Sequence, residues 1–304
     1  MQFDVLALGA TAVDHLLYVE RYPPPNVKVS VLRSARQCGG LAATALVAAA
    51  RLGARCAYAG ILGSDQASQF VRDALMREGI DLTHCLTRPN ASPIQSTIII
   101  SEREHTRNIF TEHLARCGAA DHWPPAALIS AARVLHVDHV GMAGMLRAAL
   151  IARASRVPIV SDVERDMPGA KTLLALVDHL ITSWEFAATL TGASTIEQAV
   201  RALWSTQRAL VAVTAGEEGV FYTTNGYVMH HQPAFRVRVV DTTGCGDVFR
   251  GAYCAALAWS LPAAQRIRLA AAAAALKATQ RGAQAGAPTL QQVQSLIASQ
   301  EITN

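Results

Sequence analysis

The chain has 304 residues, which at roughly 150 residues per domain predicts two domains or one large α/β domain with an appendage. Hydrophobic residues make up 51% and charged residues only 16%, which excludes a fibrous or disordered protein and predicts a large core. Lys and Arg exceed Asp and Glu by 27 − 23 = 4, and because these charges are scattered, nucleic acid is not expected as a partner.

The N-terminal segment and the cysteines predict a cytoplasmic protein. Residues 1–9 lack the basic start and long apolar run of a secretory signal, and Asp4 interrupts the first apolar stretch. The most apolar stretch, Leu269–Ala278, is about half the length of a membrane span, so we expect a buried helix and no membrane partner. The six cysteines show no C-x-x-C spacing, which favours reduced thiols over a disulfide framework or a zinc site.

Apolar runs that alternate with helical patterns predict a doubly wound α/β fold. Strands separated by helices imply a mostly parallel sheet flanked by helices. A hairpin-like pair follows at 220–222 and 227–230. The other strands are expected at 3–8, 56–61, 134–137, 158–162, 179–182 and 209–214, and the helices at 41–52, 66–78, 146–156, 170–177, 185–191 and 269–278.

Two segments depart from this alternation and predict a small β-sheet lid. The first contains a rigid turn at Tyr22–Asn26 and then Val27, Val29 and Val31 in alternation, and the second has the pattern of a hairpin. We expect them to form one sheet that projects from the main body. The expected lid comprises residues 14–37 and 95–111, and the expected α/β domain comprises residues 1–13, 38–94 and 112–304.

The segment Asp241–Ala252 is the most informative one for chemistry. Gly244 and Gly246 flank Cys245 between an apolar run and an Ala-rich helical stretch. Glycines there allow successive amides to turn toward one point, and the helix adds its positive end, which predicts an anion-binding nest. If the nest holds a phosphoryl group, Asp247 can accept the proton of an attacking hydroxyl. The alternative role for Asp247 is to cap the helix.

The usual phosphate-binding loops are absent from the sequence. Gly is nowhere followed directly by Lys, so there is no G-x-x-x-x-G-K-[ST] motif, and no G-x-G-x-x-G opens a βα unit. Any phosphate chemistry is therefore expected at residues 244–247.

Two motifs resemble the signatures of the ribokinase/PfkB family of carbohydrate kinases. Asp241-Thr242-Thr243-Gly244-Cys245-Gly246-Asp247 is similar to D-T-x-G-A-G-D, with Cys245 in place of Ala, and Gly39–Thr44 is similar to G-G-x-x-x-N. The order of elements also matches, from Val5 to about Pro288. The resemblance implies a ribokinase-like fold and ATP-dependent phosphorylation, with Mg²⁺, of a hydroxyl of a sugar or sugar derivative. It also implies homodimers built through the lids.

The resemblance assigns roles to individual residues. Asp247 becomes the general base, and Gly244, Cys245 and Gly246 the anion hole. Asp14, Gly39, Gly40 and Thr44 are expected at the sugar. The nucleotide is expected at Thr214, Gly216, Gly219, Thr242, Gly282 and Ala283, the last two in a C-terminal loop that in many members also holds a monovalent cation such as K⁺.

The chain departs from the family pattern in the N-x-x-E segment that helps to organise Mg²⁺. The corresponding positions are Ser183 and Phe186, so Glu185, one place early, either reaches the metal's water shell or the contact is missing. At the sugar motif, Leu41 and Thr44 stand where ribokinase has Lys and Asn, which makes ribose a poor candidate substrate.

Several polar residues have two interpretations. Lys28 and Arg107 in the lid either meet an anionic substituent of the sugar or are solvated surface charges. Asp138 or His139 either lines the sugar pocket or packs in the core. His136, Asp138 and His139 do not converge as metal ligands, because they alternate along a strand. Cys245 is either a reactive thiol or a small residue that fits the turn.

The sequence leaves the acceptor open. Two stretches, 40–54 and 231–249, resemble the branch that includes sulfofructose kinases. A nucleoside kinase of the same family is an alternative, since Tyr18 or Phe110 in the lid could stack a base. A catalytically weak sugar-binding sensor is a second alternative, suggested by the altered N-x-x-E segment, although the intact Asp247 argues against it.

Overall fold

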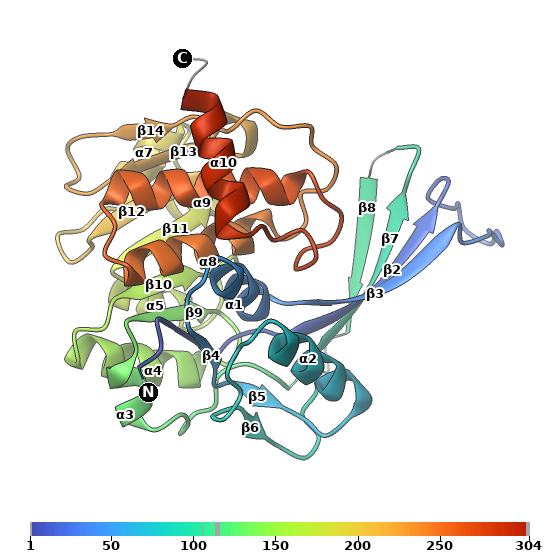
Figure 1. Cartoon of the computed structure of the whole chain (residues 1–304), viewed down its shortest axis with the longest axis horizontal. Helices are drawn as coiled ribbons and strands as arrows, with labels where there is room; N and C mark the ends of the chain where they lie inside the picture. The colour runs from blue at the N-terminus through green and yellow to red at the C-terminus, as the bar shows by residue number, and fades with distance from the viewer. Residues whose placement is uncertain (1, 105, 113–115, 302–304) are drawn as a thin grey trace.

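The structure, a computed structural model, describes residues 2–104, 106–112 and 116–301. Its centre is an eight-stranded sheet in the order β14-β13-β12-β11-β10-β9-β1-β4 (Figure 1). Neighbouring strands run parallel from β4 to β12, and β13 and β14 are antiparallel. The strands are β1 Val5–Ala7, β4 Cys56–Tyr58, β9 Val134–Asp138, β10 Ile159–Asp162, β11 His179–Ser183, β12 Leu210–Thr214, β13 Val220–Thr223 and β14 His230–Gln232.

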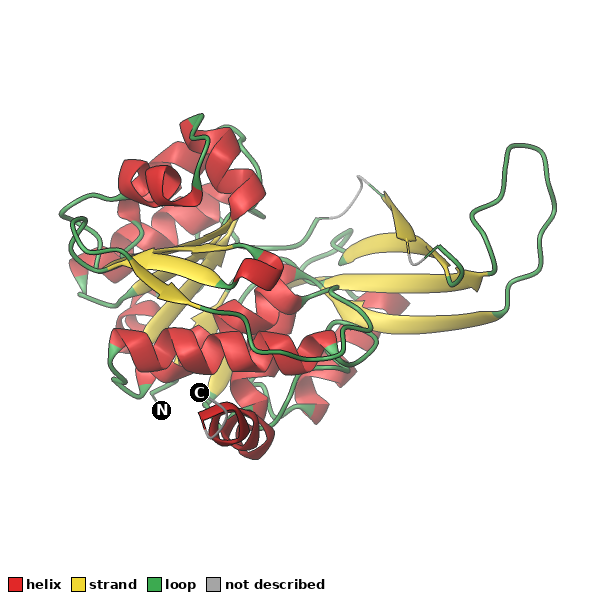
Figure 2. Ribbon diagram, turned by 90° about the horizontal axis from the view of Figure 1, so that it is seen from above, coloured by secondary structure: helices red, strands yellow, loops and turns green. Residues whose placement is uncertain are grey.

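Helices cover both faces of this sheet (Figure 2). Side chains alternate along each strand, so Val5 and Ala7 of β1 pack in one core and Leu6 packs in the other. One face carries α1 Leu41–Arg51, α2 Gln66–Arg77, α8 Cys245–Ala258, α9 Ala263–Ala278 and α10 Leu290–Glu301. The other carries α3 Ala126–Ala131, α4 Met142–Ala154, α5 Ala170–Leu176, α6 Trp184–Thr191 and α7 Ile196–Leu203.

A second, four-stranded sheet projects from the main body (Figures 1 and 2). β2 pairs antiparallel with β3 and parallel with β7, which comes from the distant second segment. A third sheet of two short strands, β5 Ile61–Leu62 and β6 Leu86–Thr87, lies under α2 (Figure 1). The strands of the projecting sheet are β2 Ala12–Val19, β3 Arg33–Gly39, β7 Ile94–Ser101 and β8 Thr106–Thr111, in the order β3-β2-β7-β8.

The predicted fold class, a doubly wound mostly parallel sheet with a small separate sheet, is confirmed. The division of the chain into a lid, residues 14–37 and 95–111, and an α/β domain that comprises the other residues stays a prediction. The predicted ranges include residues 1, 105, 113–115 and 302–304, which lie outside the described part. No helix in the described part combines the length and the apolarity needed to cross a bilayer.

Some predicted elements are wrong in detail. Val27, Val29 and Val31 alternate, but residues 20–32 form a connection without strand, and these side chains are exposed because no neighbouring strand pairs with them. The expected strand at 56–61 is split between β4 and β5. Helix α4 begins at Met142 rather than near residue 146, because Gly141, with φ of 82°, turns the chain into the helix.

Candidate active site

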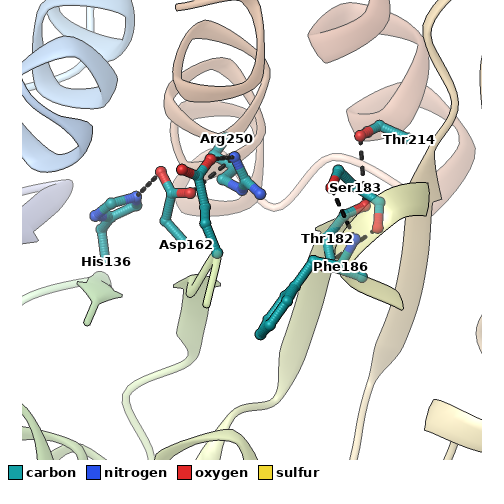
Figure 3. Close-up of polar contacts among 8 residues, drawn as sticks. His136, Asp162, Thr182, Ser183, Phe186, Thr214 and Arg250 are labelled. Carbon is teal, nitrogen blue, oxygen red and sulfur yellow. Dashed lines mark hydrogen bonds and ion pairs between the residues drawn. The ribbon is translucent and has the colours of Figure 1, made fainter. Parts of the chain in front are cut away.

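Polar residues end four adjacent strands of the large sheet. Asp138 ends β9 and lies beside Asp162, which ends β10, while Ser183 and Thr214 pair at the ends of β11 and β12. Figure 3 shows Asp162, Ser183 and Thr214 along this edge, with Arg250 of α8 beside Asp162. Ligands of open α/β sheets bind at the carboxyl ends of the strands, which makes this edge the candidate active site.

The first turn of α8 presents open amides to this edge. Gly244 precedes the helix with φ of 77°, and a Cβ on it would lie 2.6 Å from the Cβ of Ala283, so both the turn and the packing require glycine. The Cys245 amide donates to the Thr242 carbonyl at 3.2 Å. Within the described part of the chain, the Gly246 and Asp247 amides have no acceptor. The helix start can therefore bind an anion through those two amides.

Cys245 behaves as a small residue within this turn. Burial raises the pKa of its thiol to about 11, although the positive charges of Lys277 and of Arg107 on β8 oppose the shift. The thiol is therefore neutral at pH 7, which argues against the reactive-thiol interpretation. Arg107 itself is exposed on β8.

A buried ionic cluster lies beneath the first turn of α8. The Arg250 guanidinium, 3% exposed, is 2.7 Å from Asp162 Oδ1 and 3.5 Å from Glu164 Oε1. On the other side of Asp162, Oδ2 is 3.5 Å from His136 Nε2 (Figure 3). Asp162 is fully buried, and a buried carboxylate requires a partner, so Arg250 is its main source of compensation.

Asp247 joins this cluster. Carboxylate oxygens of Asp162, Glu164 and Asp247 all lie within 4.8 Å of one another. Burial raises the pKa of Asp247 well above its usual range, and the charges of Asp162 and Glu164 raise it further, while Arg250 lowers it. The helix cap is Gly244 and has no side-chain bond, so the capping alternative for Asp247 is wrong. A carboxylate with a raised pKa at an anion-binding turn is suited to accept a proton.

The expected sugar-binding residues converge at the base of the small sheet. A Cβ on Gly39 would come within 2.5 Å of Asp14 Oδ2, and a Cβ on Gly40, where φ is 95°, would come within 2.6 Å of the Ala10 carbonyl. Burial raises the pKa of Asp14 to about 6, and a hydrogen bond with Ser96 limits the shift. Thr44 is fully buried in α1, so its hydroxyl is not on the open surface.

The C-terminal loop joins the two halves of the site. The Gly282 amide donates to Asp241 Oδ2 at 2.8 Å. A Cβ on Gly282 would collide with the Gln37 amide of β3, and Arg281 lies 3.6 Å from Glu102 at the tip of the β7–β8 hairpin. With Ala283 packed on Gly244, the loop places the base of the small sheet beside the start of α8.

The remaining expected nucleotide residues lie at the neighbouring strand ends. The Thr214 hydroxyl donates to the Thr182 carbonyl at 3.3 Å (Figure 3), and Thr242 is exposed. Gly216 follows β12 with φ of 54° and has open space around it. Gly219, with φ of 92°, lies against the backbone after β14, which gives it a packing role that needs no ligand.

Of the three other candidates, Asp138 and His139 are buried and Lys28 is exposed. Asp138 is fully buried, and its carboxylate accepts the amides of Ala10 at 2.6 Å and Val140 at 2.8 Å, which favours the packing interpretation. His139 is also buried. Lys28 is exposed in the 20–32 connection, as a solvated charge would be.

The altered N-x-x-E segment forms the start of α6. The Ser183 hydroxyl caps the helix by accepting the Phe186 amide at 3.3 Å, and Phe186 is buried (Figure 3). Glu185 is exposed in the first turn. The departure from the motif therefore has a structural counterpart, because Ser183 keeps a capping role and the buried position takes an aromatic ring.

Sequence reasoning missed Asp162, Glu164 and Arg250. One signal was available, because the strand predicted at 158–162 ends in Asp162 and Glu164 follows two residues later. A second was the spacing of Arg250, three residues after Asp247, which places both on one side of a helix.

Comparisons with known proteins identify the family to which the chain belongs. A sequence profile described as pfkB family carbohydrate kinase matches residues 2–290. The chain is 28% identical to a ribokinase of Haemophilus influenzae over 96% of this chain and 97% of that protein. It is 31% identical to a fructokinase of Klebsiella pneumoniae over 73% of this chain and 78% of that protein. A crystal structure of an Agrobacterium tumefaciens protein assigned as a ribokinase superposes with a TM-score of 0.91, at 28% identity and 99% coverage of both chains.

The fold is that of the ribokinase-like α/β proteins. The chain belongs to the pfkB family of carbohydrate kinases. The enzyme class expected from the sequence, an ATP-dependent carbohydrate kinase, is confirmed at this level, whereas the acceptor and the roles of single residues stay predictions.

Replacing Arg250 should destabilise the protein strongly. Arg250→Met leaves the buried Asp162 carboxylate without its main partner, and we expect the free energy of unfolding to fall by about 3–5 kcal/mol. Asp162→Asn added to Arg250→Met should recover part of this loss, because the unpaired charge is removed. Urea denaturation at pH 7 measures both. A loss below about 1 kcal/mol for Arg250→Met, or strictly additive effects, would show that the pair is not coupled as described.

Proposed function

We propose that the protein transfers the γ-phosphoryl group of ATP to a hydroxyl of a sugar or sugar derivative. The observation that carries the proposal is that Asp247, whose carboxylate lies within 4.8 Å of those of Asp162 and Glu164, stands in the same first turn of α8 as the unbonded Gly246 and Asp247 amides. A proton acceptor and an anion-binding turn at one point are what phosphoryl transfer to an alcohol requires.

In this mechanism Asp247 accepts the proton of the attacking hydroxyl. The amides at the start of α8 offset charge on the phosphoryl oxygens as the bond to the acceptor forms. Arg250 lowers the pKa of Asp247 against the effect of Asp162 and Glu164, so it favours the ionised form, which is the form that accepts the proton. Arg250 acts through Asp247 and is a positioning residue.

Asp14 and the two glycines hold the acceptor. The ionised Asp14 carboxylate accepts hydrogen bonds from sugar hydroxyls, and Gly39 and Gly40 allow the backbone to approach the ring. The nucleotide lies along Thr214, Gly216, Gly219, Thr242, Gly282 and Ala283. Closure of the small sheet over the acceptor excludes water, which would otherwise take the phosphoryl group.

The donor set at this edge fits Mg²⁺. Carboxylates are the oxygen ligands that Mg²⁺ prefers, and the metal usually keeps several waters and nucleotide oxygens as its other ligands. Arg250 already occupies the buried side of Asp162, but Glu164 is 47% exposed in its side chain and Glu185 is exposed at α6. Glu164 and Glu185 would hold the hydrated metal. When bound with ATP, Mg²⁺ offsets the charge of the phosphate oxygens.

The acceptor is a sugar rather than a nucleoside in this proposal. Relatives include a nucleoside kinase of Methanothermobacter thermautotrophicus, at 23% identity, so the alternative stays within the family. Of the two rings considered for stacking, Tyr18 is buried and lies under the Arg33 guanidinium, at 3.9 Å, while Phe110 is exposed. Only Phe110 is therefore open to a base. The intact Asp247 argues against the alternative of a catalytically weak sensor.

Asp247→Asn should abolish most turnover. Loss of the proton acceptor should lower kcat by about 10²- to 10⁴-fold while binding of ATP changes little. ADP release is measured with ATP and Mg²⁺ over ketoses, aldoses, sugar acids, sulfosugars and nucleosides. Asp166→Asn, at an exposed carboxylate, is the control and should retain full activity. Unchanged turnover in Asp247→Asn would exclude the general base, and tight sugar binding without turnover in the wild type would favour the sensor.

The Asp14 pKa predicts a pH dependence of acceptor binding. Because burial raises this pKa to about 6, the carboxylate becomes protonated as the pH falls through 6, and KM for the acceptor should rise there. Asp14→Asn should have a high KM without this dependence. The burial penalty falls on the ionised form, so the stability of the wild type relative to Asp14→Asn should be greatest near pH 4 and decline as the pH rises through about 6. A flat wild-type KM between pH 5 and 7 would contradict the assignment.

The small sheet is also the proposed homodimer interface. Ile109 and Phe110 on its edge strand β8 are exposed, as are Val27, Val29, Val31 and Leu32 in the connection between β2 and β3. Exposed apolar side chains on an edge strand favour association with a second chain. Sedimentation velocity should show a dimer that Ile109→Glu with Phe110→Glu converts to a monomer. Leu150→Glu, at an exposed apolar residue of α4, should stay dimeric. A monomeric wild type would refute the interface.

A further inference from the structure

Lys277 is a fully buried cation in the Ala-rich helix α9. Its side chain is 0% exposed, and its Nζ donates to the carbonyl oxygens of Asp241 at 2.6 Å and Gln280 at 3.1 Å. Asp241 Oδ2 lies 3.7 Å away. Two of the three N–H donors of the ammonium group are therefore hydrogen-bonded to carbonyl oxygens, and the Asp241 carboxylate compensates the charge at ion-pair distance. Burial of a lysine is rare unless its charge is compensated in this way.

The oxygens around Lys277 belong to the segment that leads into the anion-binding turn and to the C-terminal loop that packs on this turn. Asp241 precedes Gly244, and its carboxylate also accepts the amides of Thr243 and Gly282, both at 2.8 Å. Gln280 lies in the loop after α9 that packs on Gly244 through Ala283. One positive charge therefore joins residues 241–244 to residues 280–283.

Carbonyl and carboxylate oxygens converging on one point are the donor set of a hard metal cation. The resemblance to the family implies a monovalent cation such as K⁺ beside this C-terminal loop. In this chain the expected ion does not fit, because the Lys277 ammonium already occupies this point, with hydrogen bonds to the two carbonyl oxygens and an ion pair with the Asp241 carboxylate. An ammonium group and K⁺ have similar sizes and the same charge, so one can replace the other.

We propose that Lys277 is a covalently attached substitute for a monovalent cation, and that the kinase has no requirement for K⁺. Lys277 keeps the start of α8 and the C-terminal loop together, with its charge 3.7 Å from the Asp241 carboxylate. It does not touch the reacting groups, so it is a positioning residue. The consequence for turnover rests on the proposed function, but the consequence for stability does not.

The test compares two variants of the full-length protein in different salts. Lys277→Ala removes the ammonium and opens space among the oxygens, and Lys277→Met removes the charge but fills most of that space. Turnover and the thermal midpoint are measured in KCl, NaCl and choline chloride at equal ionic strength. Lys171→Ala, at an exposed lysine, controls for the loss of a positive charge.

The wild type and Lys171→Ala should show the same kcat and thermal midpoint in all three salts. In choline chloride, both Lys277 variants should lose about tenfold or more in kcat, because the turn that carries the amides is no longer held. KCl should restore most of the kcat and the midpoint of Lys277→Ala, because an ion that binds only the folded state stabilises it. KCl should restore neither in Lys277→Met.

Activation of the wild type by KCl relative to choline chloride, or a K⁺-dependent rise of its midpoint, would overturn the proposal. So would a Lys277→Ala variant that responds to KCl in neither measurement. If no acceptor is phosphorylated, the proposed function fails, but the thermal midpoints still decide the role of Lys277. If Lys277→Ala does not fold in any salt, the response of the wild type to KCl decides it.

Discussion

Everything at the active edge depends on how the chain enters α8. Asp241 determines that entry: its carboxylate accepts two amides, one from its own turn and one from the C-terminal loop, and its carbonyl accepts the Lys277 ammonium. Gly244 then turns the chain with a positive φ, against Ala283, and the helix begins with two amides free. Without the hydrogen bonds of Asp241, the Gly246 and Asp247 amides would lose their fixed orientation, because the backbone alone orients them.

The buried charged residues beneath the start of α8 determine the electrostatics of the site. Three carboxylates gather under the helix start, and a single buried guanidinium compensates them. Such a cluster is weak evidence for stability, since desolvation opposes the attraction between buried charges. Its effect is on proton affinity: burial and like charges raise the pKa of Asp247, and Arg250 restrains that rise. The proton affinity of Asp247, the proposed general base, is thus set by neighbouring charged residues. These residues need not contact the phosphate or the sugar themselves.

Much of the fold could be predicted because its signals are local. The strand ending in Asp162 and the helix starting at Cys245 follow from apolar runs and glycine turns. The motif around Asp247 identified the reaction class because two separated signatures occur in the right order. The alternating valines at 27–31 led to a wrong strand prediction. Alternation shows only that a segment is compatible with a strand, whereas the presence of a partner strand depends on the topology of the whole sheet. Arg250 and Lys277 were missed for a related reason: their partners, Glu164 and Asp241, are distant in the chain, and only the tertiary fold brings them together.

The projecting sheet has a mechanical consequence. Its strands come from two separate segments, and β2 pairs with both β3 and β7, so the chain crosses between the main body and the sheet at the ends of β2, β3, β7 and β8. A sheet that is joined to the main body by one connection can rotate in several directions. This sheet is joined by several connections, which restrict its rigid-body rotation. Because Arg281 pairs with Glu102 and Gly282 abuts Gln37, any such rotation also pulls on the loop beneath Gly244. The small sheet and the loop that packs on Gly244 are therefore in direct contact along the active edge.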